Sequence, residues 1–341
     1  MEKLLGKTLA QLGDVARECG MPPFAAKQMA RWLYQKRVSS IDSMTDISKA
    51  CREKLAEKWE VGWTQPSERL VSKDGTAKYL FPAGGGFVEA VTIPDGDRLT
   101  LCVSSQAGCK MGCKFCMTGR GGFHGQLDAA QILSQFVAIE DGAALTNAVF
   151  MGMGEPLDNY DTLSSVLECL TADWGFAWSP KRITVSSIGV LPNLRRLLDE
   201  HRCHIAISMH NPFPEERLSV MGVEAAYPLR DVVALLKQYD FTGQRRVSFE
   251  YTMFEGFNDT RRHADAICRL LRGLECRVNL IRFHKIPDFP YGTSPDAVMT
   301  AFRDRLSSGG ITATIRASRG EDIFAACGLL SGKRGAAAAT V

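Results

Sequence analysis

The chain has 341 residues, of which 45% are hydrophobic and 23% charged, and a formal net charge of +3. This length allows one barrel-sized domain plus a smaller one, and the composition is typical of a globular protein. No apolar run reaches the roughly 18 residues of a membrane span, and the N-terminus lacks an export signal, so we expect a cytoplasmic protein. The mildly basic charge neither requires nor excludes nucleic acid as a partner.

Residues 1–60 are predicted to form a small helical domain. Its first helix follows Pro22–Pro23 and has one apolar stripe, formed by Ala25, Met29, Trp32 and Leu33. Four basic residues lie off this stripe: Lys27, Arg31, Lys36 and Arg37. They form either an RNA-contacting surface or a solvated face, and composition alone favours the second. Another helix is expected after the capping sequence 43–48, through about Lys58.

Residues 61–96 change to β character and are interpreted as a connector. Three short β-like runs, at 70–72, 77–81 and 87–93, are separated by Asp74–Gly75 and by the glycines at 84–86. Both separators are turn signals, which favours antiparallel strands.

Residues 97–330 are predicted to form the catalytic domain, because strand and helix patterns alternate there. The expected strands are 99–103, 147–152, 183–187, 204–208, 246–253, 276–281 and 311–315, with helices such as 129–137, 229–238 and 263–271. Such alternation favours an α/β fold, a partial (β/α)6 barrel whose chemistry gathers at the carboxyl ends of the strands. A short helix through 325–327 and a flexible tail at 331–341 complete the prediction.

Three cysteines, Cys109, Cys113 and Cys116, stand within eight residues after the first of these strands. The spacing suits a loop that supplies three of the four ligands of a [4Fe–4S] cluster and leaves one iron open. Zinc or structural thiols are the alternative, although no second cysteine or histidine pair completes a zinc site. Eleven irregularly spaced cysteines indicate reduced thiols rather than a disulfide framework.

The cysteine loop, with Phe115 before its last cysteine, resembles the radical S-adenosylmethionine (SAM) superfamily, in which the open iron chelates SAM. The Gly154–Glu155 turn follows the next strand, and the polar residues Ser186 and Ser208–His210 follow two more. Strand ends of this kind are plausible places for ligand contacts. Cys327 stands between small residues far from the cluster in sequence, and on its own it is equally a structural thiol.

Several motifs in order resemble one family, the RlmN/Cfr radical SAM RNA methyltransferases, and its RlmN branch most closely. They are Val88–Glu89, Leu101–Gln106, Gly108–Gly119, Gly152–Leu157 and Asp322–Gly328. The resemblance runs from the Pro23–Phe24 helix to Cys327 and implies methylation of carbon 2 of an adenosine in 23S rRNA, and in some members of tRNA. Carbon-8 methylation of the Cfr type is the close alternative; an activase-like radical SAM enzyme and a redox-sensing RNA-binding protein are more distant ones.

The resemblance also implies residue roles. One SAM would methylate Cys327, and a second, cleaved at the cluster, would yield a 5′-deoxyadenosyl radical that activates this methyl group. The resulting carbon radical would add to the adenine, Cys102 would resolve the protein–RNA adduct by forming a disulfide with Cys327, and Glu89 would accept the ring proton. Contacts with SAM would come from Gly154, Glu155, Ser186, Ser208, Met209, His210 and His284.

His284 departs from the family pattern, because many relatives carry Asn there. The expected partners are 23S rRNA, tRNA and a reducing protein such as flavodoxin or ferredoxin. A monomer is expected.

Overall fold

The computed structural model describes residues 1–243 and 245–332. Its N-terminal part contains α1 (Leu9–Glu18), α2 (Ala25–Ala30), a π-helical turn (Arg31–Gln35), a 3-10 turn (Ile41–Ser43) and α3 (Lys49–Lys58). The sequence analysis did not predict α1, although the side chains of Thr8 and Gln11 form a capping box at its start. The short parallel pair of β1 (Glu2–Lys3) with β2 (Trp59–Glu60) joins the two ends of this helical part.

The predicted apolar stripe of the N-terminal helix is buried. Lys27, Arg31 and Lys36 are exposed, as expected for a face that meets solvent or RNA. Arg37 differs, because its guanidinium donates to the carbonyl of Gly142 in the catalytic region at 2.7 Å. Tyr34 packs against Trp174 with ring centroids 5.7 Å apart, so apolar contact also holds the two parts together.

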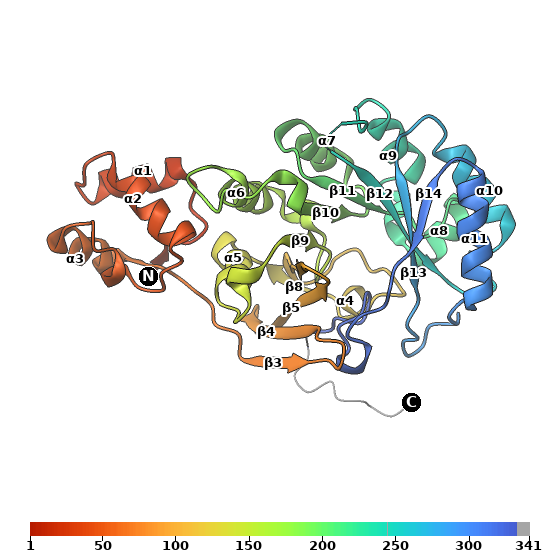
Figure 1. Ribbon diagram of the computed structural model, residues 1–341, viewed down its shortest axis with the longest axis horizontal. Coiled ribbons are helices and arrows are strands. Elements are labelled where there is room, and N and C mark those ends of the chain that lie inside the picture. The colour runs from red at the N-terminus through yellow and green to blue at the C-terminus, as the bar shows by residue number, and fades with distance from the viewer. Residues whose placement is uncertain (244, 333–341) are drawn as a thin grey trace.

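One sheet of ten strands runs through the rest of the molecule (Figure 1). Its antiparallel side consists of β3 (Glu68–Val71), β4 (Ala77–Ala83), β5 (Gly86–Asp95) and β6 (Arg98–Cys102). On its parallel side β6 is followed by β9 (Asn147–Phe150), β10 (Ile183–Ser187), β11 (His204–Ser208), β12 (Val247–Met253), β13 (Arg277–Arg282) and β14 (Thr312–Ile315). The strands of the predicted connector therefore continue the catalytic sheet.

Helices connect the parallel strands, which confirms the predicted α/β class. They are α5 (Ala129–Val137), α6 (Tyr160–Thr171), α7 (Leu191–Glu200), α8 (Pro214–Val220), α9 (Leu229–Leu236), α10 (Arg261–Leu270) and α11 (Asp296–Ser308). Their apolar faces bury against the sheet. The edge strands β3 and β14 do not pair with each other over the described ranges, so the barrel stays open, as a partial barrel should. None of the helices in residues 1–243 and 245–332 is long and apolar enough to cross a membrane.

The prediction of a helix through residues 325–327 is wrong. Only a 3-10 turn, Glu321–Ile323, forms in this region, and Cys327 lies in a turn after it. Gly320 and Phe324 flank the 3-10 turn with φ of 63° and 53°, and such left-handed backbone ends a helix. The Asp322 carboxylate accepts hydrogen bonds from the Ser72 hydroxyl and the Lys73 amide, which fixes the segment to the β3–β4 turn. Residues 333–341 of the predicted tail lie outside the described residues.

A hairpin frames the cysteine loop. It pairs β7 (Gln106–Gly108) with β8 (Phe123–Gln126), and the loop and the short α4 (Met117–Arg120) lie between them. Gly108 has a φ of +75°, and a Cβ there would stand 1.9 Å from the carbonyl oxygen of Gly122. The two strands of the hairpin can therefore approach this closely only when residue 108 is a glycine.

Gly108→Ala is expected to destabilise the fold more than Gly112→Ala. Both glycines have positive φ, so each alanine adds backbone strain of about 1–2 kcal/mol, but a Cβ at Gly112 meets nothing within 4 Å. The clash at Gly108 adds an overpacking cost of about 1–3 kcal/mol. Urea unfolding of the two variants measures the difference, and equal losses would show that the close approach does not constrain the hairpin.

Candidate active site

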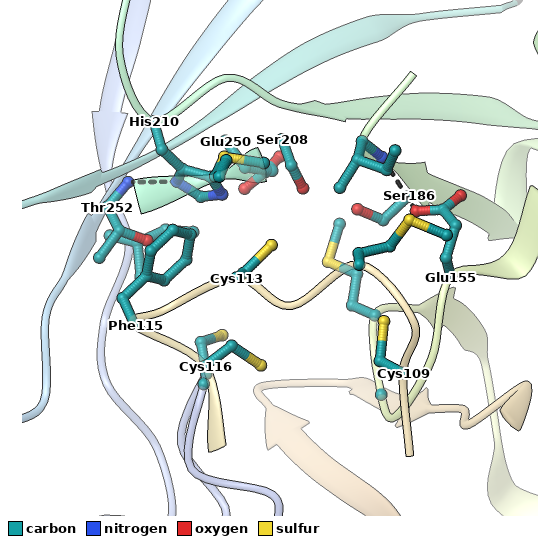
Figure 2. Close-up of a pocket in the computed structure, with 18 of the residues that line it drawn as sticks. Cys109, Cys113, Phe115, Cys116, Glu155, Ser186, Ser208, His210, Glu250 and Thr252 are labelled. Atoms are coloured by element: carbon teal, nitrogen blue, oxygen red, sulfur yellow. Dashed lines mark hydrogen bonds between the residues drawn. The ribbon is translucent and has the colours of Figure 1, made fainter. Parts of the chain in front are cut away.

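A cavity of about 170 Å³ opens at the carboxyl ends of the parallel strands. The cysteine loop forms one wall, and Glu155, Ser186 and Ser208, each at or after the end of a strand, form another (Figure 2). The sequence analysis named most of these residues, and the fold brings them together because parallel strands present their carboxyl ends at one edge.

Backbone hydrogen bonds hold the cysteine loop at several points. The amide of Cys109 donates to Gly122 at 2.8 Å, and that of Lys114 donates to Val220 at 3.0 Å. The amide of Met117, just after the last cysteine, donates to Gly328 at 2.8 Å. These contacts fix the loop to the hairpin, to the region after α8 and to the segment that carries Cys327.

The three cysteines fit a [4Fe–4S] cluster better than a single ion. Figure 2 shows Cys109, Cys113 and Cys116 turned into one space. Within the described part of the chain, no three His, Cys, Asp or Glu side chains converge closely enough to hold one metal ion. In a cubane each thiolate binds a different iron atom. The three sulfur atoms therefore stand farther apart than the ligands of a single metal ion. Burial raises the pKa of the Cys109 thiol to about 12, so a cation must offset the cost of its thiolate, and a cluster would do so.

Glu155 is a buried carboxylate, only 3% exposed, on the wall of the cavity. Its oxygens accept hydrogen bonds from the amides of Leu157 at 3.1 Å and Ile188 at 3.0 Å. Burial raises its pKa to about 7. The loss of hydration outweighs the hydrogen bonds from the two amides, which favour the charged carboxylate. A carboxylate in this state gains from a cationic ligand, such as the ammonium group of SAM.

The end of β11 is held by the buried side chain of Arg217. This guanidinium donates to the carbonyls of Ser208 and Met209 at 3.0 Å and forms a buried ion pair with Glu224. Ser208 and His210 consequently line the cavity. Met209 does not, because its side chain is fully buried in the core. The resemblance implied that the segment Ser208–His210 contacts SAM, and within it the residues that line the cavity are Ser208 and His210.

His210 is a neutral imidazole. Its Nδ1 accepts a hydrogen bond from the amide of Thr252 at 3.0 Å, so the ring proton belongs on Nε2 (Figure 2). Burial, followed by the charge of Arg217, lowers its pKa to about 3. Its ring packs edge-on to Phe115 with centroids 4.8 Å apart, which links the strand end to the cysteine loop.

Cys327 and Cys102 are brought together although 225 positions separate them. Both line a small cavity of about 70 Å³ together with Cys116. Cys327 also lines the cavity of the cysteine loop and is exposed. Burial, and after it the neighbouring Cys327, raise the pKa of Cys102 to about 12. The pair of thiols is thus placed beside the cysteine loop.

Glu89 lies close to this region but lines none of the three cavities that Cys327 lines. It is 1% exposed, and one carboxylate oxygen accepts from the amides of Ser331 and Gly332 at 3.3 and 2.9 Å. Its other oxygen lies 3.5 Å from the ammonium of Lys78, which is 2% exposed. Burial raises the pKa of Glu89. The segment after Cys327 therefore covers this carboxylate.

His284 does not line the cavity of the cysteine loop. Its Nε2 is 3.1 Å from the hydroxyl of Ser318, and the residue lines a neighbouring cavity of about 250 Å³. The family resemblance implied a SAM contact here, and the preceding residue, Phe283, does line the cavity of the cysteine loop.

The sequence analysis missed two charged residues of the cavity of the cysteine loop, Arg316 and Glu250. Arg316 directly follows β14, and its guanidinium lies 3.4 Å from the buried carboxylate of Glu250 on β12. The search for polar residues at strand ends that identified Ser186 would also have identified Arg316. Glu250 gave a weaker signal, because it is the one charged residue inside its strand.

Comparison with known proteins gives matches over nearly the whole chain. Residues 2–61 match the ribosomal RNA large subunit methyltransferase N-terminal domain, and residues 103–267 match the radical SAM superfamily. A protein of Parabacteroides distasonis named "Probable dual-specificity RNA methyltransferase RlmN" is 59% identical over 96% of both chains. The RlmN protein of Syntrophus aciditrophicus is 38% identical over 96% of this chain and 95% of its own.

A solved structure is also similar. The crystal structure of a radical SAM methyltransferase from Sphaerobacter thermophilus superposes with a TM-score of 0.90 and 37% identity. The match covers 98% of this chain and 100% of that one.

Glu224→Ala is expected to cost about 3–5 kcal/mol of unfolding free energy, because it leaves the guanidinium of Arg217 buried with its charge unpaired. Glu215→Ala, an exposed position at the start of α8, is the control and should stay within about 0.5 kcal/mol of the parent. Urea unfolding measures both. A small effect at Glu224 would mean that the backbone carbonyls alone hold Arg217.

Proposed function

Because the chain belongs to the RlmN family of radical SAM RNA methyltransferases, we propose that it methylates carbon 2 of an adenosine in 23S rRNA through S-methylated Cys327. The observation that carries this proposal is the position of Cys327, exposed, beside Cys102 and on the wall of the cavity that the three cluster cysteines line. We extend the proposal to a tRNA adenosine, and the words "dual-specificity" in the relatives' names support a second RNA.

A methyl carrier answers a chemical difficulty. Carbon 2 of adenine is electron-poor and its C–H bond is inert, so it cannot attack the methyl group of SAM directly. The sulfur of Cys327 can, with loss of its proton and release of S-adenosylhomocysteine. The cluster held by Cys109, Cys113 and Cys116, when bound, supplies the electron that cleaves a second SAM into methionine and a radical that removes a hydrogen atom from this methyl group.

Cys102 is proposed to release the product. The adduct in which the methyl carbon is bonded to both the adenine and the Cys327 sulfur first gives up its unpaired electron, which the oxidised cluster would take back. The Cys102 thiolate then attacks that sulfur. The carbon–sulfur bond breaks, a Cys102–Cys327 disulfide forms, the ring proton leaves, and the freed methylene carbon takes up a proton. The shared cavity of the two cysteines supports this step, because a disulfide requires their Cβ atoms to approach closely.

Glu89 is proposed as the acceptor of the ring proton. Its burial raises its pKa, which suits a base that must take a proton near neutral pH. The amides of Ser331 and Gly332 occupy one of its oxygens, so this role requires the segment after Cys327 to move aside when RNA is bound.

The remaining roles follow the family. We propose that residues 1–60 form an accessory domain that contacts RNA through the exposed Lys27, Arg31 and Lys36, and that 61–96 and 97–330 form the connector and the catalytic domain. We also propose SAM contacts at Gly154, Glu155, Ser186, Ser208 and His210, a flavodoxin or ferredoxin as electron donor, and a cytoplasmic monomer as the working form.

The reaction is tested by anaerobic reconstitution with iron and sulfide, followed by incubation with SAM, dithionite and protein-free 23S rRNA. Mass spectrometry should find 2-methyladenosine, S-methylated Cys327 and 5′-deoxyadenosine. Cys327→Ala should abolish RNA methylation, whereas Cys102→Ala should accumulate a covalent protein–RNA adduct that survives a denaturing gel. Cys276→Ala is the matched control. Cys276 directly precedes β13, whereas the other end of this strand lines the cavities. An exclusively carbon-8 product, or full turnover by Cys327→Ala, contradicts the proposal.

SAM binding is expected to weaken at acidic pH. Since burial raises the pKa of Glu155 to about 7, the carboxylate that pairs with the ammonium of SAM becomes neutral as pH falls through this value. The dissociation constant should rise about tenfold between about pH 8 and about pH 6. Anaerobic equilibrium dialysis measures it, with Glu155→Gln expected to bind weakly and with a flat pH profile. A flat profile in the parent protein would mean that Glu155 does not pair with SAM.

A further inference from the structure

A second cavity lies on the other side of Cys327. It has a volume of about 250 Å³ and shares Cys327, Arg316 and Ile281 with the cavity of the cysteine loop. It is bounded by the ends of β5 and β13 and by the segment after β14. Cys327 is exposed and lines both cavities, so it stands at the boundary between them.

The walls of this second cavity differ from end to end. The residues that it shares with the small cavity of Cys102 and Cys327 are mostly apolar: Ile93, Val149, Ala325 and Ala326, with Arg316 as the one charged residue among them. The remaining wall carries Arg282, Arg319, His284 and Ser318, with Asp95 as its one acidic residue. A flat heterocycle suits the apolar end, and an anion suits the basic end.

The arginines retain donors for a ligand. Arg319 has one ion pair, to Asp95 at 3.7 Å, which is longer than a hydrogen bond. Arg282 uses one terminal nitrogen on the carboxylate of Asp296, an exposed residue at the start of α11. A guanidinium has five N–H donors, so most of them are left over from these contacts. The N–H donors of a guanidinium are arranged as a planar fork, and this geometry matches the oxygens of a phosphate group.

We propose that the second cavity binds one nucleotide of the RNA substrate, unstacked from its strand, with the base against Cys327 and a flanking phosphate at Arg282 and Arg319. His284 and Ser318, 3.1 Å apart, supply neutral hydrogen-bonding groups between these two ends. This inference rests on the proposed function and gives His284 and Arg319 a place in substrate binding rather than in SAM binding.

The arrangement separates the two ligands of the reaction. SAM occupies the cavity of the cysteine loop, and the acceptor base occupies the cavity beyond Cys327. The sulfur between them receives a methyl group from one side and presents it to the other, so the two ligands need not compete for one space.

The test uses the reconstituted full-length protein and a protein-free fragment of 23S rRNA, with binding measured by fluorescence anisotropy over a range of salt concentrations. Arg319→Gln and Arg282→Gln should each weaken RNA binding about tenfold. If each arginine contacts one phosphate, the slope of log K against log salt should fall in magnitude by about 0.7 for each variant. SAM affinity of the same preparations reports whether the first cavity is intact.

Arg303→Gln is the matched control, since this arginine is exposed on α11 and pairs with the adjacent Asp304. This substitution should change neither the RNA affinity nor the slope of log K against log salt. Competition by small probes gives a second readout: adenosine 5′-monophosphate should displace the RNA at lower concentration than adenosine, and Arg319→Gln should abolish that difference.

The outcomes separate the two proposals. If the parent protein makes no methylated adenosine, the proposed function fails. If it methylates RNA while both arginine variants bind RNA with unchanged affinity and slope, the function stands and the nucleotide site is wrong. Equal competition by adenosine and its monophosphate would overturn the assignment of the phosphate to the arginines.

Discussion

Two hydrogen bonds between chain segments more than 200 residues apart hold the active site together. The amide of Met117 donates to the carbonyl of Gly328, and the hydroxyl of Thr118 donates to the carbonyl of Leu330 at 2.6 Å. They join the end of the cysteine loop to the segment that carries Cys327. This link holds Cys327 beside the three cysteines of the loop, which is the position that the proposed methyl carrier needs.

Burial dominates the electrostatics of the site. It raises the pKa of Glu155 to about 7, lowers that of His210 to about 3 and raises that of Cys102 to about 12. All three shifts favour the neutral form, as expected where few charges compensate one another. Of these three groups Glu155 has the pKa nearest to neutral, so it is the one that the approach of a cationic ligand most readily ionises.

Much of the architecture was predictable because the strands are periodic and buried. The strands β6 and β9 to β14 lie where the alternation of apolar runs placed them, and Asp128 caps α5 as its sequence position indicated. Local pattern failed where tertiary contacts decide the backbone, as around residues 325–327. The flanking residues Asp322, Phe324 and Gly328 accept hydrogen bonds from the β3–β4 turn, from β4 and from α4. The sequence also could not show that the end of β13 lies between two cavities. Phe283 lines the cavity of the cysteine loop with the ends of β10 and β11, whereas Arg282 and His284 line the neighbouring one.

The antiparallel strands β4 and β5 are more than a link between two domains. They carry Lys78 and Glu89, two charged groups buried beneath the segment that holds Cys327, and Lys78 donates to the carbonyl of Phe324 in that segment at 3.4 Å. A buried ion pair gives little net stability, because removing two charges from water costs about as much as their attraction returns. One carboxylate oxygen of Glu89 even lacks a hydrogen-bond partner within the described residues. The pair contributes little to stability and lies against the backbone of the segment that carries Cys327. The proton-accepting role proposed for Glu89 accounts for such a pair better than stability does, and under that proposal β4 and β5 contribute to the site together with the parallel strands.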